Sequence, residues 1–172
     1  MAEEFSIGQI FEAEYPPEAA VWCNEGGVAY IDEIEPTQEG VRRFQIVAVP
    51  EPTLEEVKSQ RLSELNDAHE KAEEDAYVVS SLGFTVDADD RANRDVEGLL
   101  KTMKDGETVS FCDYQNQFHE LTKAELETLQ VEIIQNAQTL YSQKWAYRTQ
   151  IESAESADEV RAISFDFTHL AF

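Results

Sequence analysis

Apolar residues recur every three or four positions over two long stretches of the chain, residues 53–82 and 122–152. This spacing predicts two amphipathic helices. At 1.5 Å per residue, helices of about 30 residues would each be roughly 45 Å long. Gly83 ends the first helix, and a break near Ala76–Tyr77 is an alternative. Alternating apolar positions elsewhere predict short strands.

Three Ser/Thr-x-x-Glu sequences mark expected helix starts, at Thr53, Thr122 and Ser156. In such a capping box the hydroxyl accepts the backbone N–H three residues later, and the glutamate reaches back to the capping residue's N–H. The box at Ser156 predicts a short last helix that extends through Ile163.

The first 50 residues predict a small β-rich module. Strands are expected at 28–34 and 41–49, after a short helix that begins beside Pro16-Pro17 and ends at Gly26-Gly27. The sequence Pro50-Glu-Pro52 is a stiff spacer. We therefore expect two domains, residues 1–50 and 53–172.

Between the long helices, the pattern predicts a short strand at 84–86, a helix that ends at Met103 and a β-hairpin at 109–121. Gln115-Asn116 would form the hairpin's turn, and Val109, Phe111 and Asp113 would share one face. The tail, residues 164–172, fits a strand or an apolar anchor. The expected fold class is α+β: a small β-rich N-terminal module, then a helical domain with two long helices, a short helix and a β-hairpin.

The two long helices have two plausible arrangements. In the favoured one they pack as an antiparallel pair within one chain. In the other, the second helix enters an intermolecular coiled coil, with polar Asn136 and Gln143 in its core. The apolar positions of that heptad pattern are Leu126, Leu129, Ile133, Leu140 and Tyr147.

The chain has 13 Lys+Arg and 36 Asp+Glu, and a formal net charge of −23. This balance argues against nucleic acid and against an anionic membrane surface as partners, because both need clustered cations. The acidic surface keeps the protein soluble. The alternative is an acidic face that binds a basic partner or cations. No stretch approaches the roughly 20 apolar residues of a membrane span. The N-terminus has no signal-peptide pattern, so we expect synthesis in the cytosol.

Candidate chemistry is sparse, so we expect no enzyme activity, no cofactor and no metal. His69, His119 and His169 are far apart and lack partners at metal-ligand spacing. Acidic residues around Asp87–Asp90 depart from the calcium-loop pattern and suit a helix start. Cys23 and Cys112 suggest no disulfide framework, and we expect both to be small buried residues.

Trp145 admits two interpretations: an anchor in the core or at the domain junction, or the centre of a subunit contact. Aromatic residues and arginine are enriched at the centres of interfaces, and Lys144 and Arg148 flank this tryptophan. The candidate interface residues are Trp22, Tyr141, Trp145, Arg148, Phe165, Phe167 and Phe172.

Three parts of the sequence carry a resemblance to a known family. The main part is the hairpin that begins at Phe111 together with the Lys144-Trp145-x-x-Arg148-x-x-Ile151 run; Gly83–Leu100 and the front segment from Ala20 to Thr53 add to it. Together they resemble a domain-of-unknown-function family found in tail modules of bacteriophages and prophages, with its small N-terminal module.

The resemblance implies a structural phage-tail protein that links or adapts a tail-fibre or baseplate protein, or alternatively a fibre-assembly chaperone absent from the mature virion. The implied partners are tail-fibre or baseplate proteins. The implied location is the virion tail, or only the host cytoplasm for a chaperone. A homo-oligomer is also expected, with a trimer favoured because phage fibres are trimeric. No catalytic residue is implied.

Overall fold

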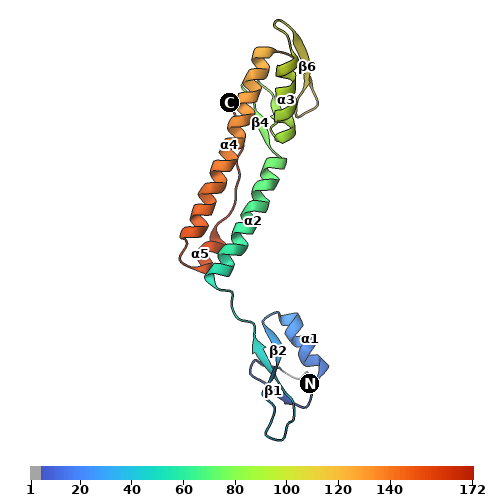
Figure 1. Ribbon diagram of the computed structural model, residues 1–172, viewed down its shortest axis with the longest axis vertical. Coiled ribbons are helices and arrows are strands. Elements are labelled where there is room, and N and C mark those ends of the chain that lie inside the picture. The colour runs from blue at the N-terminus through green and yellow to red at the C-terminus, as the bar shows by residue number, and fades with distance from the viewer. Residues whose placement is uncertain (1–4) are drawn as a thin grey trace. The chain divides into compact units, whose positions relative to one another are not determined.

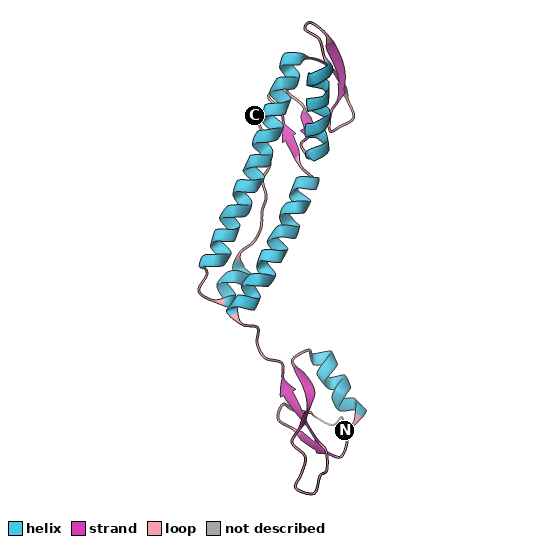
Figure 2. Ribbon diagram, viewed as in Figure 1, coloured by secondary structure: helices cyan, strands magenta, loops and turns pink. Residues whose placement is uncertain are grey.

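The computed structural model describes residues 5–172, which form two compact units, residues 5–52 and 53–172. The described residues form five helices and three small antiparallel sheets, so the predicted α+β class is confirmed. Figure 2 shows that the first unit is built around strands and that helices dominate the second.

The first unit is a three-stranded antiparallel sheet with one helix, α1 (Pro17–Gly26). The predicted strands are confirmed as β2 (Ala29–Ile34) and β3 (Arg43–Ala48), and β3 lies between β2 and β1 (Ile10–Glu12). The sequence pattern missed β1 because three residues are too few to show alternation. The buried core of this unit is formed by Phe5, Ala19, Cys23, Ala29 and Ile46.

In the second unit, α2 (Leu54–Glu74) and α4 (Lys123–Ser153) pack side by side and antiparallel (Figure 1). Lys58 Nζ, near the start of α2, donates a hydrogen bond of 2.9 Å to Glu152 O, near the end of α4. Val57 and Ile151 also share a buried cluster. The favoured intramolecular arrangement is therefore confirmed. The other helices of this unit are α3 (Asp90–Thr102) and α5 (Ala157–Ala162).

The expected extension of the first long helix to Leu82 is wrong. α2 ends at Glu74, and the chain then forms a β-hairpin of β4 (Tyr77–Val79) and β5 (Thr85–Asp87). The alternative break near Ala76–Tyr77 is correct. Gly83 lies in the hairpin turn with φ of 93°, a left-handed conformation that favours glycine. Val78 and Val86 pair across the hairpin and are fully buried, which favours the strand conformation.

The second β-hairpin pairs β6 (Thr108–Cys112) with β7 (Phe118–Thr122), close to the prediction. Val109 and Phe111 pack against the core and Asp113 is buried, so the three lie on one face, as expected. Cys112 alternates with them and is exposed, which corrects the expectation that it is buried. At the turn, Asp113 Oδ1 accepts the backbone N–H groups of Gln115 and Gln117, each at 2.8 Å.

The helix starts follow the predicted caps with one difference. Complete capping boxes are present at Thr53 and Thr122. Ser156 also caps its helix, but Glu159 accepts the N–H of Glu155 instead of that of Ser156.

The C-terminal tail, residues 163–172, is an extended strap and not a regular strand. It runs along the pair formed by α2 and α4 (Figure 1), and Phe167 contributes to the buried clusters there. Near its end, Ala171 forms one isolated parallel bridge with Val79. Through Phe167 the strap therefore contacts both buried clusters of this unit, the one that includes Val57 and the one that includes Leu140.

Candidate functional site

The most distinctive surface of the second unit is an exposed apolar face along α4. It consists of Val131, Ile134, Tyr141 and Trp145, which are 53, 41, 53 and 48 % exposed, respectively. Their spacing of three, seven and four residues keeps them on one side of the helix, and Gln138 fills the gap in the series. We call these five residues the α4 face.

A different stripe of α4 forms the domain core, so this helix has two apolar sides. The core stripe contains Leu126, Leu129, Ile133, Leu140 and Ile151, all essentially buried. The α4 face therefore contributes nothing to the two buried clusters of this unit. A single apolar side is sufficient for a helix on a domain surface. On the second side, Tyr141 packs edge-on against His69 of α2, and the face as a whole stays largely exposed.

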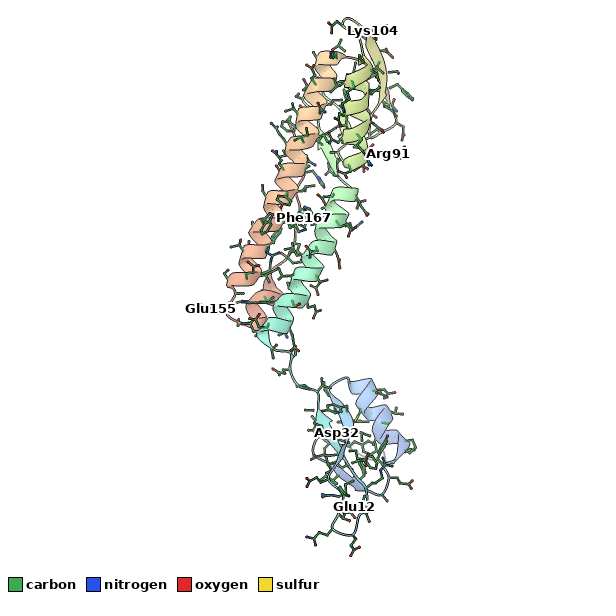
Figure 3. The ribbon with its side chains drawn as sticks, viewed as in Figure 1. Glu12, Asp32, Arg91, Lys104, Glu155 and Phe167 are labelled. Atoms are coloured by element: carbon green, nitrogen blue, oxygen red, sulfur yellow. The ribbon has the colours of Figure 1, made fainter. Side chains whose placement is uncertain are left out.

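Beside the α4 face, the second unit has a groove of about 1020 Å³. Its floor is α4, where Ile134, Ala137 and Tyr141 contribute exposed apolar surface over buried Ile133 and Leu140. Its rim comes from the end of α2 and the start of α3, where Arg91 is labelled in Figure 3. The charged residues that line the groove are Glu70, Glu73, Glu74, Asp89, Asp90, Arg91 and Arg94.

The rim is predominantly acidic, with five carboxylates and two guanidinium groups. Arg91 is directed to Asp95, at 3.8 Å between Nε and Oδ2, and is 83 % exposed. The C-terminal carbonyls of α2 add negative partial charge at this rim and the N-terminal N–H groups of α3 add positive partial charge, so its acidic character comes from the five carboxylates. The floor, by contrast, is uncharged, because α4 has no charged residue between Glu132 and Lys144. The groove therefore combines an apolar seat with an acidic rim.

Three of the seven predicted interface residues lie together on α4. The rings of Tyr141 and Trp145 are 6.0 Å apart in an edge-to-face arrangement, and Arg148 Cζ is 5.3 Å from the Trp145 ring centroid. Arg148 Nε also donates to Glu152 Oε1 at 2.8 Å. Of the two interpretations of Trp145, the core anchor is wrong, because nearly half of its surface is exposed.

The other four predicted residues lie elsewhere. Trp22 is half-buried and packs on the core of the first unit. Phe165 and Phe167 both pack edge-on against Tyr147 inside the second unit. Phe172 is 46 % exposed, and its N–H donates to Val79 O. The structure thus brings only the α4 residues into one surface.

The sequence reasoning missed Val131, Ile134 and the acidic rim. Spacing could have identified the first two, because positions 131, 134, 138, 141 and 145 follow the three-four repeat of a coiled-coil seam. The rim could not be found in this way, since Glu70–Glu74 and Asp89–Asp90 belong to separate segments and are indistinguishable from the other acids of this chain.

Two histidines are associated with the C-terminal strap: His69 of α2 packs against it, and His169 belongs to it. His69, 4 % exposed, packs against Phe167 and Tyr141, and burial lowers its pKa against the opposing effect of the nearby Glu73 charge. Burial also lowers the pKa of His169, whose ring lies 4.5 Å from that of Tyr77.

The third histidine supports the hairpin turn. His119 Nε2 lies 2.8 Å from Asp113 Oδ2, and this bond is the largest of the effects that lower the pKa of Asp113. Among residues 5–172, no group of three or more His, Cys, Asp or Glu side chains is arranged to hold a metal ion.

Polar side chains of α4 attach the strap at three points. Asn136 Oδ1 accepts the Leu170 N–H at 2.7 Å, and Gln143 Oε1 accepts the Thr168 N–H at 3.0 Å. Tyr147 donates its hydroxyl to Asp166 O at 2.8 Å. The residues considered as the polar core of an intermolecular coiled coil thus hold the chain's own tail.

Residues 56–168 match the family described as Domain of unknown function (DUF4376), and the chain belongs to this family. The match covers almost all of the second unit, which includes the α4 face and the groove. No curated protein and no solved structure matches the chain. In residues 5–172, no helix has both the length and the apolar character that a membrane crossing requires.

Proposed function

We propose that this protein is a non-enzymatic structural component of a phage tail, which links a tail-fibre or baseplate protein to the rest of the tail. The observation that carries the proposal is the α4 face, a row of exposed apolar side chains that its own domain leaves uncovered. Exposed aromatic residues beside arginine are typical of the centres of protein interfaces. The resemblance of the hairpin and the Lys144–Ile151 run to tail-module proteins supplies the tail context.

The two-unit organisation also supports a linking role. Each unit has its own buried core, and the proline-containing segment 50–52 joins them. A chain of this kind can bind a different partner with each unit. On this proposal the protein is made in the host cytoplasm and becomes part of the virion tail, without nucleic acid or membrane as a partner.

Mass spectrometry of purified particles tests the proposal. Phage particles would be induced from a host that carries this gene, purified on a density gradient and compared with particles from a strain in which the gene is deleted. We expect peptides of this protein at a constant ratio to the tail proteins. Its absence from intact particles would contradict the structural role.

The acidic groove also favours the second candidate, a tail-fibre assembly chaperone that leaves before maturation, because such a site suits reversible binding of an exposed chain. The test is co-expression of the neighbouring fibre gene with and without this protein. We expect more soluble, protease-resistant fibre with it if the chaperone role is correct. An unchanged fibre yield would exclude that role.

Self-association, with a trimer favoured, remains a prediction alongside either role. Light scattering coupled to size exclusion at micromolar concentration measures it directly. We expect a mass of three chains, and the mass of one chain, 19.5 kDa, would contradict the prediction.

A further inference from the structure

We propose that the groove beside the α4 face binds an amphipathic helix of a partner protein, with apolar residues on one side of that helix and basic residues on the flank that faces α2 and α3. The proposal deepens the linking role above, because it identifies where a tail partner would bind and what chemistry that partner would have.

The geometry of the floor fits a helix. The α4 face runs from Val131 to Trp145, roughly 21 Å along the helix axis, and its middle residues Ile134, Gln138 and Tyr141 line the groove. Its positions follow the three-four spacing that packs one helix against another. Ala137 lies among these residues and also lines the groove, and its small side chain leaves space for a partner's larger one.

The charges select a basic partner. Carboxylates at the end of α2 and the start of α3 flank the apolar floor. On α4 itself, residues 133–143 are uncharged, and the nearest charged residues are Glu132 and Lys144. Lysine or arginine on the partner's flank would meet the rim while its apolar residues cover Ile134 and Tyr141. Electrostatic complementarity of this kind increases the association rate and discriminates between partners.

The same charges argue against a second copy of this chain in the groove. Each copy has a formal net charge of −23. A second α4 would bring its own acidic rim toward the first, and like charges across an interface cost several kcal/mol. Any self-association of this protein therefore uses a different surface.

Fluorescence of Trp145 gives a direct test on the full chain. The protein has two tryptophans, so the Trp22→Phe variant leaves Trp145 as the only reporter. Its ring is 6.0 Å from that of Tyr141, which lines the groove. The probe is a synthetic helical peptide of about 16 residues, long enough for the roughly 21 Å of the face, with leucine at three-four spacing and lysine on one flank. A second peptide has glutamate in place of every lysine.

We expect the lysine peptide to shift the Trp145 emission with a micromolar Kd that weakens as salt is added, and the glutamate peptide to bind at least about tenfold more weakly. The double variant Ile134→Glu/Tyr141→Glu should lose about tenfold or more in affinity for the lysine peptide, because charge replaces the apolar seat. Its matched control, Thr128→Glu/Gln135→Glu, changes the net charge equally on another side of α4 and should bind within about twofold of the parent.

This comparison separates a seated helix from general attraction. A nonspecific attraction to an acidic protein would strengthen in both double variants, and that result would overturn the proposal. Equal binding of the two peptides, or no binding of either, would overturn it as well. So would an oligomer of the parent protein that Ile134→Glu/Tyr141→Glu dissociates, since the groove would then bind a second copy.

Circular dichroism checks that each variant is folded. If the double variant is not folded, Ala137→Phe provides an uncharged second test that adds no tryptophan emission, since it fills the groove from an exposed position. This variant should also lower the affinity for the lysine peptide by about tenfold. Unchanged affinity would overturn the proposal. These results concern the isolated protein. A failure here leaves the presence of the protein in particles to mass spectrometry, so the two proposals fail separately.

Discussion

Asn136 is the one fully buried polar side chain in the core stripe of α4. Its amide oxygen accepts the N–H of Leu170, and its amide nitrogen is 3.5 Å from His169 Nδ1. A buried backbone N–H that loses its acceptor retains the full cost of its removal from water. Asn136 thus fixes the position of the strap along α4.

We therefore predict that Asn136→Leu lowers the free energy of unfolding by about 1–3 kcal/mol, although it makes the core more apolar. Urea denaturation followed by circular dichroism measures the change. Gln135→Leu is the matched control, because this neighbouring side chain is exposed and should change stability by less than about 0.5 kcal/mol. Equal effects of the two variants would mean that the strap does not depend on this amide.

Trp145 gives the opposite case, a large aromatic residue with little role in stability. Its ring packs edge-on against Tyr141 and lies under the guanidinium of Arg148, and both partners are exposed. A buried tryptophan would cost about 3–5 kcal/mol on truncation to alanine, whereas exposed cation–π contacts contribute about 0.5–1 kcal/mol.

We predict a loss of no more than about 1 kcal/mol for Trp145→Ala, measured by urea denaturation. Leu140→Ala, at a fully buried position on the same helix, should cost about 2–5 kcal/mol and serves as the reference. A Trp145→Ala loss as large as that of Leu140→Ala would place the tryptophan in a buried contact.

The sequence placed these residues on the right helix but could not distinguish its two apolar sides. Leu126, Leu129, Ile133 and Leu140 do lie on one side of α4, as the heptad pattern predicted. That side is buried in the core of the chain's own second unit. Local spacing identifies a stripe and does not say what covers it. That depends on α2, α3 and the strap, which lie far away in sequence.

At the scale of elements, the strap is the least conventional part of the second unit. It has almost no strand pairing, so its attachment comes from α4 side chains and from burial of Phe165 and Phe167. Figure 3 shows Phe167 between α4 and α2. His69 and His169 lie under or within this strap in surroundings that disfavour their charged forms.

We predict that the protein is less stable at pH 5.5 than at pH 7.5. The pKa values of both histidines are lowered from 6.5 in the folded chain, so the unfolded chain binds protons first as the pH falls. Their contribution is therefore complete above about pH 6.5 and is lost progressively below it, by at most about 1.4 kcal/mol per pH unit for each histidine.

Urea denaturation at the two pH values measures this effect. The variant His69→Phe/His169→Phe keeps aromatic rings at both positions and removes the titration, so its stability should change less between pH 7.5 and 5.5. An equal change in the parent and the variant would attribute the pH dependence to other groups.

The break after α2 shows why element boundaries were harder to predict than element types. Ala76, Val79 and Leu82 continue the helical spacing of residues 53–75, so the local pattern favours a longer helix. Pairing of Tyr77–Val79 with Thr85–Asp87 and burial of Val78 stabilise the hairpin instead. The capping boxes at Thr53 and Thr122, by contrast, depend only on residues three positions apart and were correctly located.

At the scale of the whole molecule, each buried cluster lies within one of the two units. Phe5, Cys23 and Ile46 belong to a cluster within residues 5–52, whereas Val57, Leu140 and their neighbours form clusters entirely within 53–172. Two of the three clusters thus belong to the larger unit, and Phe167 packs against both of them. The acidic groove and the α4 face also lie entirely within that unit.

We therefore predict that residues 53–172 fold without the first unit. A chain of these 120 residues retains Thr53 as the cap of α2 and every residue of both clusters, and its size is sufficient for an independent core. Its urea midpoint should match that of the corresponding transition in the full chain, and lysine-peptide binding at Trp145 should remain. Residues 5–52 have a smaller core, so we expect that unit alone to be the less stable of the two. A non-cooperative or strongly destabilised unfolding of 53–172 would show that the first unit supports the second, and the assignment of the groove to an autonomous domain would then be wrong.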